Sequence, residues 1–429
     1  MKNIASCAKC FLAVLLPSFA LRAPAETARP YLVVGTGQTG CYDNYRQIAP
    51  PQPGQPFFGQ DAQHPGPAPS YKDNGDGTVS DLNTGLAWVK ARGEKLAWAD
   101  AMAGASACRA GGYADWRMPT IKELYSLINF NGGCGGTVAN SRPYLDTRYF
   151  QFAYGDESRG VRIIDCQDWS ATQYVGKTMG GNPTVFGVNF ADGRIKGYPK
   201  AFPGGRVGQM YVRYVRGNSA YGRNDFQDNG DGTISDRATG LIWQKADGGK
   251  GMNWEQALAY AANSRLAGHT GWRLPNAKEL QSIVDYTRAP SVTQSAAISP
   301  LFQVTQLSGG DYPFFWTGTT HLDGPPDRRG TAAVYIAFGR ATGWMPAHGG
   351  PPGLGGPGLG GPDQGPPGFG PPPSSGAGTY QLLDVHGAGA QRSDPKTGDP
   401  GTFPHGRGPQ GDVIRIDNYV RLVRGPLVP

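Results

Sequence analysis

The sequence predicts an α+β fold that is made twice, as two tandem domains that each carry two helices and antiparallel strands. Three observations lead to this prediction. A series of sequence blocks occurs twice in the same order, and each copy has two stretches with helical spacing of apolar residues. The last third of each copy alternates short β-type runs with turns. The 429 residues are enough for two or three ordinary domains, and an aromatic content of 11% is enough to build cores.

The repeated blocks set the domain limits. "DNGDGTVSDLNTGLAWVKA" begins at Asp73, and "DNGDGTISDRATGLIWQKA" begins at Asp228. "DWRMPTIKEL" and "GWRLPNAKEL" follow, then "WSAT" and "WTGT", "FADGR" and "FGR", and finally "YVRYVRG" and "YVRLVRG". A period of roughly 150 residues is the size of a domain and not of a solenoid repeat. We therefore expect domains at 71–217 and 226–425, each with its own tryptophan-centred core, and an insertion in the second at about 341–410.

Each domain opens with a turn between two short strands. In "DNGDGT" the Asn-Gly and Asp-Gly pairs supply residues that accept positive φ, which favours a hairpin turn. A weak cation site is the alternative for these aspartates. Glycines stand where an EF-type loop would place ligands and no glutamate closes the loop, so the turn is the better interpretation and no metal is predicted.

Two helices follow in each copy. The first is expected from about Leu96, with an apolar face of Trp98, Ala101, Met102 and Ala105. Threonine or asparagine precedes the second helix and glutamate stands three residues later, which is a capping-box spacing. The residues with predicted structural roles are Trp88, Trp116, Arg117, Thr120 and Glu123 in the first copy and Trp243, Trp272, Arg273, Asn276 and Glu279 in the second.

Together these blocks resemble the bacterial Lcl C-terminal domain family, a domain of unknown function named for its place at the end of a collagen-like surface adhesin. The resemblance covers nearly all of residues 71–425, twice. The "WRLP" and closing-strand pattern also looks like a C-type-lectin-like fold, which is shared with sulfatase-modifying enzymes. The resemblance thus implies two tandem C-type-lectin-like domains. Many family members have a cysteine in the closing block, where this chain has Tyr214 and Leu422, so that family disulfide has no counterpart here.

The first 25 residues have the pattern of a cleaved secretory signal, with lysines, a short apolar run and "APA" ending at Ala25. A cysteine- and proline-containing segment, 26–70, would come next. No other apolar run is long enough to span a bilayer, so we expect an exported protein in the periplasm, on the cell surface or secreted. The whole chain has a net charge of +7, and removal of Lys2, Lys9 and Arg22 with the leader leaves 37 − 33 = +4, which does not argue for nucleic-acid binding.

Four cysteines follow the leader, and in an oxidising compartment an even set suggests disulfides. Cys134 and Cys166 have no counterparts in the second copy and form the predicted pair, which leaves Cys41 with Cys108. Burial of Cys108 as a free thiol is an equally good alternative, because it continues the apolar face of the first helix.

Binding is the favoured function, because no nucleophile elbow, metalloprotease motif, P-loop or dinucleotide fingerprint is present, and no cofactor is predicted. The ligand would be a surface or matrix glycan, sulfated or acidic, or an envelope protein. An enzyme or enzyme-derived scaffold and a structural envelope protein are the alternatives.

The glycine- and proline-rich insertion breaks the collagen triplet, and its His386 and His405 are expected to be solvated. The candidate ligand-binding residues are Arg194, Tyr198, Arg340 and Trp344.

Overall fold

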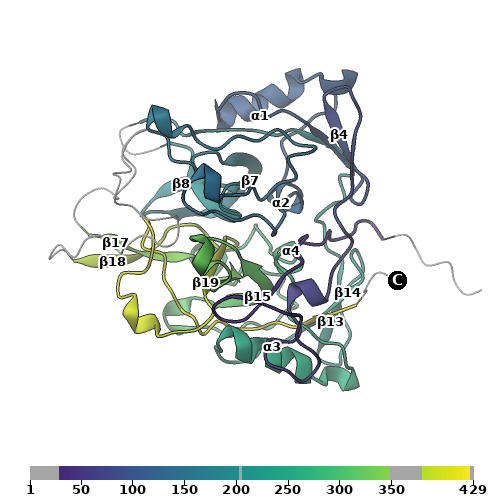
Figure 1. Ribbon diagram of the computed structural model, residues 1–429, viewed down its shortest axis with the longest axis vertical. Helices are drawn as coiled ribbons and strands as arrows, with labels where there is room; N and C mark the ends of the chain where they lie inside the picture. Colours follow the sequence, from purple (N-terminus) through teal and green to yellow (C-terminus); the bar gives the residue numbers. More distant parts are fainter. Residues whose placement is uncertain (1–28, 202–204, 348–378, 426–429) are drawn as a thin grey trace, which may run out of the picture.

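The computed structural model describes residues 29–201, 205–347 and 379–425, so the predicted signal segment and residues 348–378 of the glycine- and proline-rich insertion lie outside the described residues. Figure 1 shows the two repeats one above the other, with α1 and α3 at opposite ends and α2 and α4 in the middle. The mixture of helices with mainly antiparallel strands confirms the predicted α+β class. The α-helices are α1 Trp98–Ala107, α2 Ile121–Ser126, α3 Trp254–Asn263, α4 Ala277–Ser282 and α5 Pro290–Thr293.

The first and second helices of each repeat differ in how much of their surface they bury. On α1, Ala101 and Ala105 are buried, but Met102 is exposed, so the buried face is narrower than its apolar spacing predicts. The capping boxes of α2 and α4 are present as predicted, formed by Thr120 with Glu123 and by the equivalent pair of the second repeat. These caps satisfy backbone N–H groups that a helix start would otherwise leave unpaired.

Each repeat has its own small antiparallel sheet, in which the closing strand pairs with the second strand after the repeated turn. The orders are β11-β5-β4-β3 and β12-β13-β14-β20. The turn in the first repeat has Gly75 and Gly77 at φ of 78° and 85°, a conformation that favours glycine. The strands are β3 Tyr71–Asp73, β4 Thr78–Asp81, β5 Leu86–Val89, β11 Val215–Gly217, β12 Phe226–Asp228, β13 Thr233–Asp236, β14 Leu241–Gln244 and β20 Val423–Arg424.

A six-stranded sheet joins the two repeats. Its order is β15-β16-β19-β9-β8-β7, so each repeat contributes three strands, and the strands of one repeat mirror the order of those of the other. The two middle strands, β19 and β9, pair at Gln391 and Ile195. The repeats are therefore related by an approximate twofold axis that passes between these two strands. The strands are β7 Asp168–Thr178, β8 Asn182–Asn189, β9 Arg194–Pro199, β15 Phe314–His321, β16 Ala332–Ala337 and β19 Gln391–Pro395.

The position of β19 departs from the sequence alignment of the repeats. The "FGR" block ending at Arg340 aligns with the block that begins β9, yet the chain after it forms β17, which pairs with β18 in a separate hairpin. Strand β19 takes the place beside β16 that β9 takes beside β8. The remaining strands are β1 Cys41–Tyr42, β2 Gln47–Ile48, β6 Leu96–Ala97, β10 Gln209–Met210, β17 Thr342–Pro346 and β18 Tyr380–Asp384.

The expectation of a separate core in each repeat is wrong in part. Trp88 of the first repeat and Trp243 of the second are fully buried in one continuous apolar cluster that also contains residues of α2 and α4. Each repeat keeps a smaller cluster of its own, around Trp169 in the first and Trp316 in the second. The largest core is shared because the inner helices and the central sheet both meet at the twofold axis.

Two lysines fasten the inner helices to each other across this axis. Lys122 of α2 donates a hydrogen bond to the carbonyl of Ser282 at the end of α4, with 2.6 Å between the atoms. Lys278 of α4 donates to the carbonyl of Ser126 at the end of α2, at 2.7 Å. Each ammonium thus caps the C-terminus of the opposite helix, where unpaired carbonyl groups favour positive charge.

Candidate functional site

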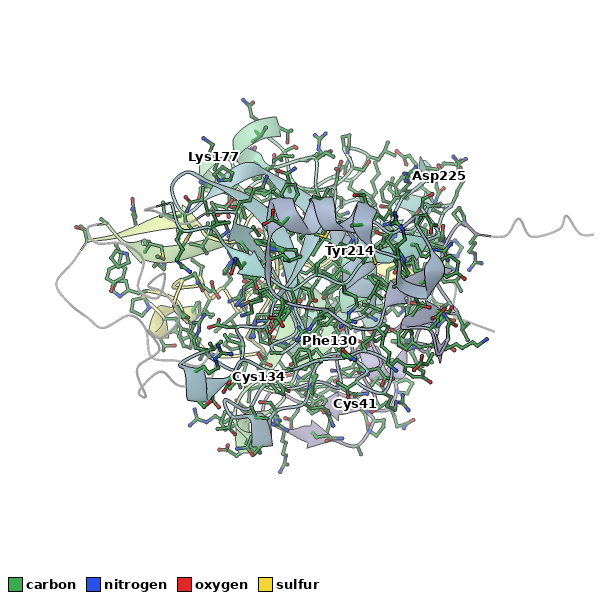
Figure 2. The ribbon with its side chains drawn as sticks, turned by 90° about the horizontal axis from the view of Figure 1, so that it is seen from above. Cys41, Phe130, Cys134, Lys177, Tyr214 and Asp225 are labelled. Carbon is green, nitrogen blue, oxygen red and sulfur yellow. The ribbon has the colours of Figure 1, made fainter. Side chains whose placement is uncertain are left out.

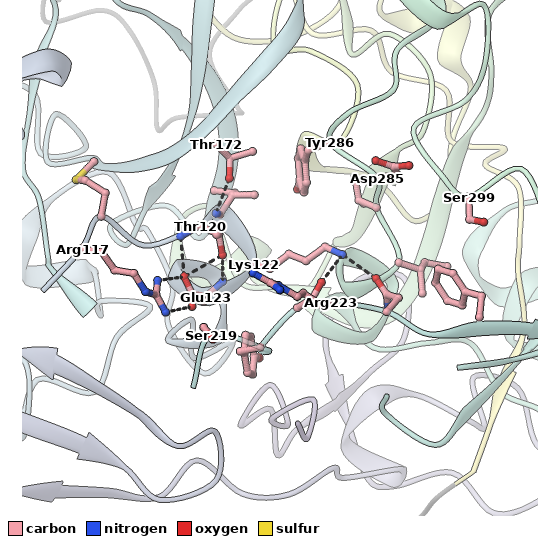
Figure 3. Close-up of a pocket in the computed structure, with 18 residues that line it drawn as sticks. Arg117, Thr120, Lys122, Glu123, Thr172, Ser219, Arg223, Asp285, Tyr286 and Ser299 are labelled. Atoms are coloured by element: carbon pink, nitrogen blue, oxygen red, sulfur yellow. Dashed lines mark hydrogen bonds and ion pairs between the residues drawn. The ribbon is translucent and has the colours of Figure 1, made fainter. Parts of the chain in front are cut away.

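A cavity of about 620 Å³ lies at the junction of the two repeats. Its walls come from α2 and the residues before it, from the linker around Ser219–Phe226, and from the segment after α4 at Ile283–Tyr286. Figure 3 shows these side chains, with Lys122 reaching between α2 and the second repeat. The cavity exists only because the repeats pack together, since both contribute walls.

The α2 side of the cavity is rigid. Glu123 accepts two hydrogen bonds from the Arg117 guanidinium, at 2.7 and 2.6 Å, and a third from the backbone N–H of Thr120 at 2.8 Å. Glu123 is buried, whereas about a third of the Arg117 side chain is exposed. The bidentate pair holds the guanidinium plane in one orientation beside the cavity, and Arg273 with Glu279 repeats the pair in the second repeat.

Lys122 is the titratable amine in the cavity wall. Burial lowers its pKa from 10.5 to about 8, against the opposing effect of Asp236 and Asp285. Its ammonium donates to the carbonyls of Gly222 and Ser282 and to the Asn224 side chain, which uses all three N–H groups. The amine is therefore held as a charged structural group at neutral pH.

Three other polar groups in the cavity keep unused capacity. Thr172 Oγ1 accepts from the backbone N–H of Ile121, but no described residue accepts the proton of its hydroxyl. Arg223 is exposed, and its guanidinium makes no ion pair or hydrogen bond with a described residue. Asp285 uses one carboxylate oxygen to accept from Thr287, and the aromatic side chains of the wall complete an amphipathic surface.

The sequence profile of the Lcl C-terminal domain matches residues 77–216 and 232–347, which together are more than half of the chain. The chain belongs to the Lcl C-terminal domain family. No curated protein and no solved structure matches it. The cavity is thus formed between two tandem Lcl C-terminal domains and by the linker that joins them.

The candidate ligand-binding residues do not line this cavity. Arg194 is buried, where it pairs with Asp323 at 2.5 Å and Asp192 at 3.3 Å, so it is not available to an external ligand. Its expected surface role is wrong, because β9 lies in the middle of the central sheet. Tyr198 packs edge-on against Trp169 on the same strand system.

The other two candidates lie in the second Lcl C-terminal domain, near the β17–β18 hairpin. Arg340 is half-exposed and 3.5 Å from Asp311, and Trp344 is half-buried in β17 opposite Leu382. Neither residue lines the cavity.

The four described cysteines are free thiols, so both predicted disulfides are absent. Cys134 and Cys166 share one buried apolar cluster, and burial raises the pKa of both thiols. Cys41 lies beside Lys396 of the second domain, whereas Cys108 ends α1 in the first domain beside Tyr214. Figure 2 shows Cys41 well apart from Tyr214, so a bridge between Cys41 and Cys108 does not fit the fold.

The repeated aspartates act locally in the turns. Asp73 accepts from the N–H of Gly75 and from Lys90, and Asp76 accepts from the N–H and hydroxyl of Thr78. These contacts agree with the turn interpretation. Across the described ranges, no group of three or more His, Cys, Asp or Glu side chains could hold a metal.

The expected solvation of His386 is wrong. His386 is buried, and its Nε2 lies 2.7 Å from Asp412, because the described end of the insertion, from residue 379 onward, packs against the central sheet. His405 stacks on Tyr380, with 3.8 Å between the ring centroids.

In the described part of the chain, no helix is both long and apolar enough to cross a membrane.

Sequence reasoning missed Lys122, Thr172 and Arg223, which are the residues that give the cavity its polar character. One signal was present for the lysine. It occurs at the same place in both copies, in "TIKEL" and "NAKEL", directly before the buried leucine stripe. A lysine at that place in both helices is a sign that it has a partner outside its own repeat.

Proposed function

We propose that this chain is an exported binding module that takes an anionic ligand in the cavity between its two domains. The observation that carries the proposal is that two polar groups on the wall of that cavity have no partner among the described residues: the guanidinium of Arg223 and the hydroxyl proton of Thr172. The volume of about 620 Å³ is within the range of ordinary ligand pockets.

The chemistry of the wall favours carboxylate or sulfate groups. A guanidinium binds either group through two parallel hydrogen bonds, and Arg117, whose charge is already paired with Glu123, lies in the same wall in a fixed orientation. Phe226 and Tyr286 supply the apolar surface that would accept a sugar ring or an aliphatic side chain. An acidic or sulfated glycan and an acidic segment of an envelope protein are both ligands of this kind.

Binding is preferred to catalysis because the two ionisable groups that α2 contributes to the wall, Lys122 and Glu123, are already engaged. Glu123 accepts from Arg117 and Thr120, and Lys122 uses all three of its N–H groups. Either group would have to break structural hydrogen bonds before it could act as an acid, base or nucleophile. A C-type-lectin-like fold for each domain is part of the same proposal, supported by two helices followed by antiparallel strands.

The test is a binding measurement on the full chain with two matched variants. Wild-type protein is titrated with sulfated glycans, carboxylated glycans and acidic peptides at two salt concentrations. Arg223→Gln should weaken the binding of the preferred class by about 10-fold or more, since a charged hydrogen bond contributes roughly 1.5–3 kcal/mol. Arg46→Gln, which removes an equal charge from an exposed position outside the cavity, should leave it unchanged. Failure of all three classes to bind, or equal losses in both variants, would refute the proposal.

A further inference from the structure

The second domain contains a site equivalent to the cavity, and the chain's own N-terminal segment fills it. Asp61 begins the 3-10 turn η1, Asp61–Gln63, and is buried against the second domain. Its carboxylate accepts hydrogen bonds from Thr319 at 2.5 Å and from Thr36 at 2.7 Å. A carboxylate on a peptide segment is thus the resident ligand of that site.

The threonine of the filled site corresponds to the threonine of the open cavity. Thr319 Oγ1 accepts from the backbone N–H of Ala277, at the start of α4. Thr172 Oγ1 accepts from the backbone N–H of Ile121, at the start of α2. The two hydroxyl groups therefore occupy matching positions, but within the described residues only Thr319 donates to a carboxylate.

Each site has a second polar group, and these two groups also lie at matching positions. The lysine of α4 donates to the carbonyl of Gly35, and the lysine of α2 donates to the carbonyl of Gly222. The residues that follow these glycines, Thr36 and Arg223, therefore lie at matching places in the two sites. Where Thr36 donates its hydroxyl to Asp61, the open cavity offers a guanidinium, which binds a carboxylate more strongly.

Matching residues of the filled site and the open site differ in how much of their surface is exposed. Thr319 is completely buried, whereas Thr172 is partly exposed. Trp254 of α3 is also completely buried, with the ring of Phe57 from the N-terminal segment at 6.3 Å. The matching Trp98 of α1 is partly exposed, so the first domain lacks an equivalent cover.

One difference affects how closely a ligand backbone approaches. Gly318 lies beside the N-terminal segment, and a Cβ there would meet the backbone nitrogen of Asp61 at 3.2 Å. The first domain has Ala171 at this position, whose backbone N–H makes the matching bond to Pro119. A ligand in the open cavity must therefore lie a few tenths of an ångström further out than the resident segment does.

We infer that the open cavity receives a peptide segment of another protein, and that an aspartate or glutamate of this segment binds between Thr172 and Arg223. An aromatic residue four positions earlier in the segment would contact Trp98, as Phe57 and Asp61 do in the second domain. This inference rests on the proposed function and narrows its ligand to an acidic peptide. A peptide is favoured over a glycan because the equivalent site holds one.

The ligand segment comes from a different protein because the chain's own segment is already engaged. Gln38 of the same segment donates to the carbonyls of Phe130 and Thr320, at 3.2 and 2.8 Å, and is buried. A second copy of the chain holds its segment in the same contacts and has none to offer.

The probe is a synthetic peptide with the sequence of residues 56–66, PFFGQDAQHPG, compared with the same peptide carrying asparagine in place of Asp61. Both are titrated into the full chain and followed by fluorescence anisotropy. The carboxylate peptide should bind at least 10-fold more tightly than the asparagine peptide. Thr172→Val and Arg223→Gln should each weaken its binding, Arg46→Gln should not, and Ala171→Gly should strengthen it by removing the steric conflict.

The outcomes separate this inference from the proposed function. Equal binding of the two peptides, or binding that neither cavity variant weakens, would overturn the inference. If a sulfated glycan binds in an Arg223-dependent manner and the carboxylate peptide does not, the inference fails and the proposed function stands. If no anionic ligand binds, both fail. A carboxylate-dependent gain in the Ala171→Gly variant is expected only if the two sites correspond as described.

Discussion

Replacing Asp61 with asparagine should remove a pH dependence of stability that this single carboxyl group causes. Burial raises its pKa from 3.8 to about 6, although hydrogen bonds from Thr319 and Thr36 act in the opposite direction. Because the folded-state pKa is raised, the folded protein binds this proton more tightly than the unfolded chain between pH 4 and 6. The carboxyl group therefore contributes stability that is complete below pH 4 and is lost as the pH rises through about 6.

The pKa difference corresponds to about 3 kcal/mol in the free energy of unfolding. The assay is urea denaturation of both proteins at intervals from pH 3.5 to 7. The free energy of unfolding of the wild type minus that of Asp61→Asn should fall by up to about 3 kcal/mol across this range. Most other titrating groups cancel in the difference, since asparagine has nearly the shape of aspartate. A difference that stays constant within about 0.5 kcal/mol would show that the carboxyl group is not buried as described, and the account of the filled site would fail.

Three further predictions test the rest of the fold. Burial lowers the pKa of Lys278 from 10.5 to about 7. The free energy of unfolding of the wild type relative to that of Lys278→Met should therefore increase as the pH rises from 7 to 10, by about 5 kcal/mol at most. A flat profile would contradict the burial of this amine. Arg273→Lys should lower the free energy of unfolding by about 1.5–3 kcal/mol because lysine cannot form the bidentate pair with Glu279. Arg117→Lys should lower it by less because Arg117 is partly exposed. Equal losses of unfolding free energy in the two variants would contradict this reasoning. A thiol reagent should label Cys108 in the folded protein and the three buried thiols only in denaturant; denatured, unreduced protein with no reactive thiol would mean that disulfides form.

Local features were predictable from the sequence because neighbouring residues create them. The capping boxes need only a threonine or asparagine and a glutamate three residues later, and both are present in the structure. The glycine-bearing turns are determined in the same way, by residues that accept positive φ. In each case the interacting groups are a few positions apart, so no knowledge of the packing was required.

The cavity was not predictable because its walls come from five separate stretches of chain. Thr172, Arg223 and Asp285 meet only after two repeats have packed across an axis that no sequence block encodes. The error about Arg194 has the same origin. An arginine after a turn looks exposed in one repeat, but the edge strand that it begins is covered when the second repeat extends the sheet.

The two binding positions differ because the chain segments that complete them differ, while the repeats themselves are alike. The N-terminal segment precedes the first repeat but covers the second, and the linker precedes the second repeat but lines the cavity of the first. Each position therefore combines a helix of one repeat with chain from outside that repeat, so neither is complete in an isolated domain. Duplication produced two equivalent surfaces, one of which is closed by Asp61, and the open one carries Arg223 where the closed one has Thr36. No described residue pairs with the guanidinium of Arg223, and its charge is explained if the partner is an acidic group supplied from outside the chain.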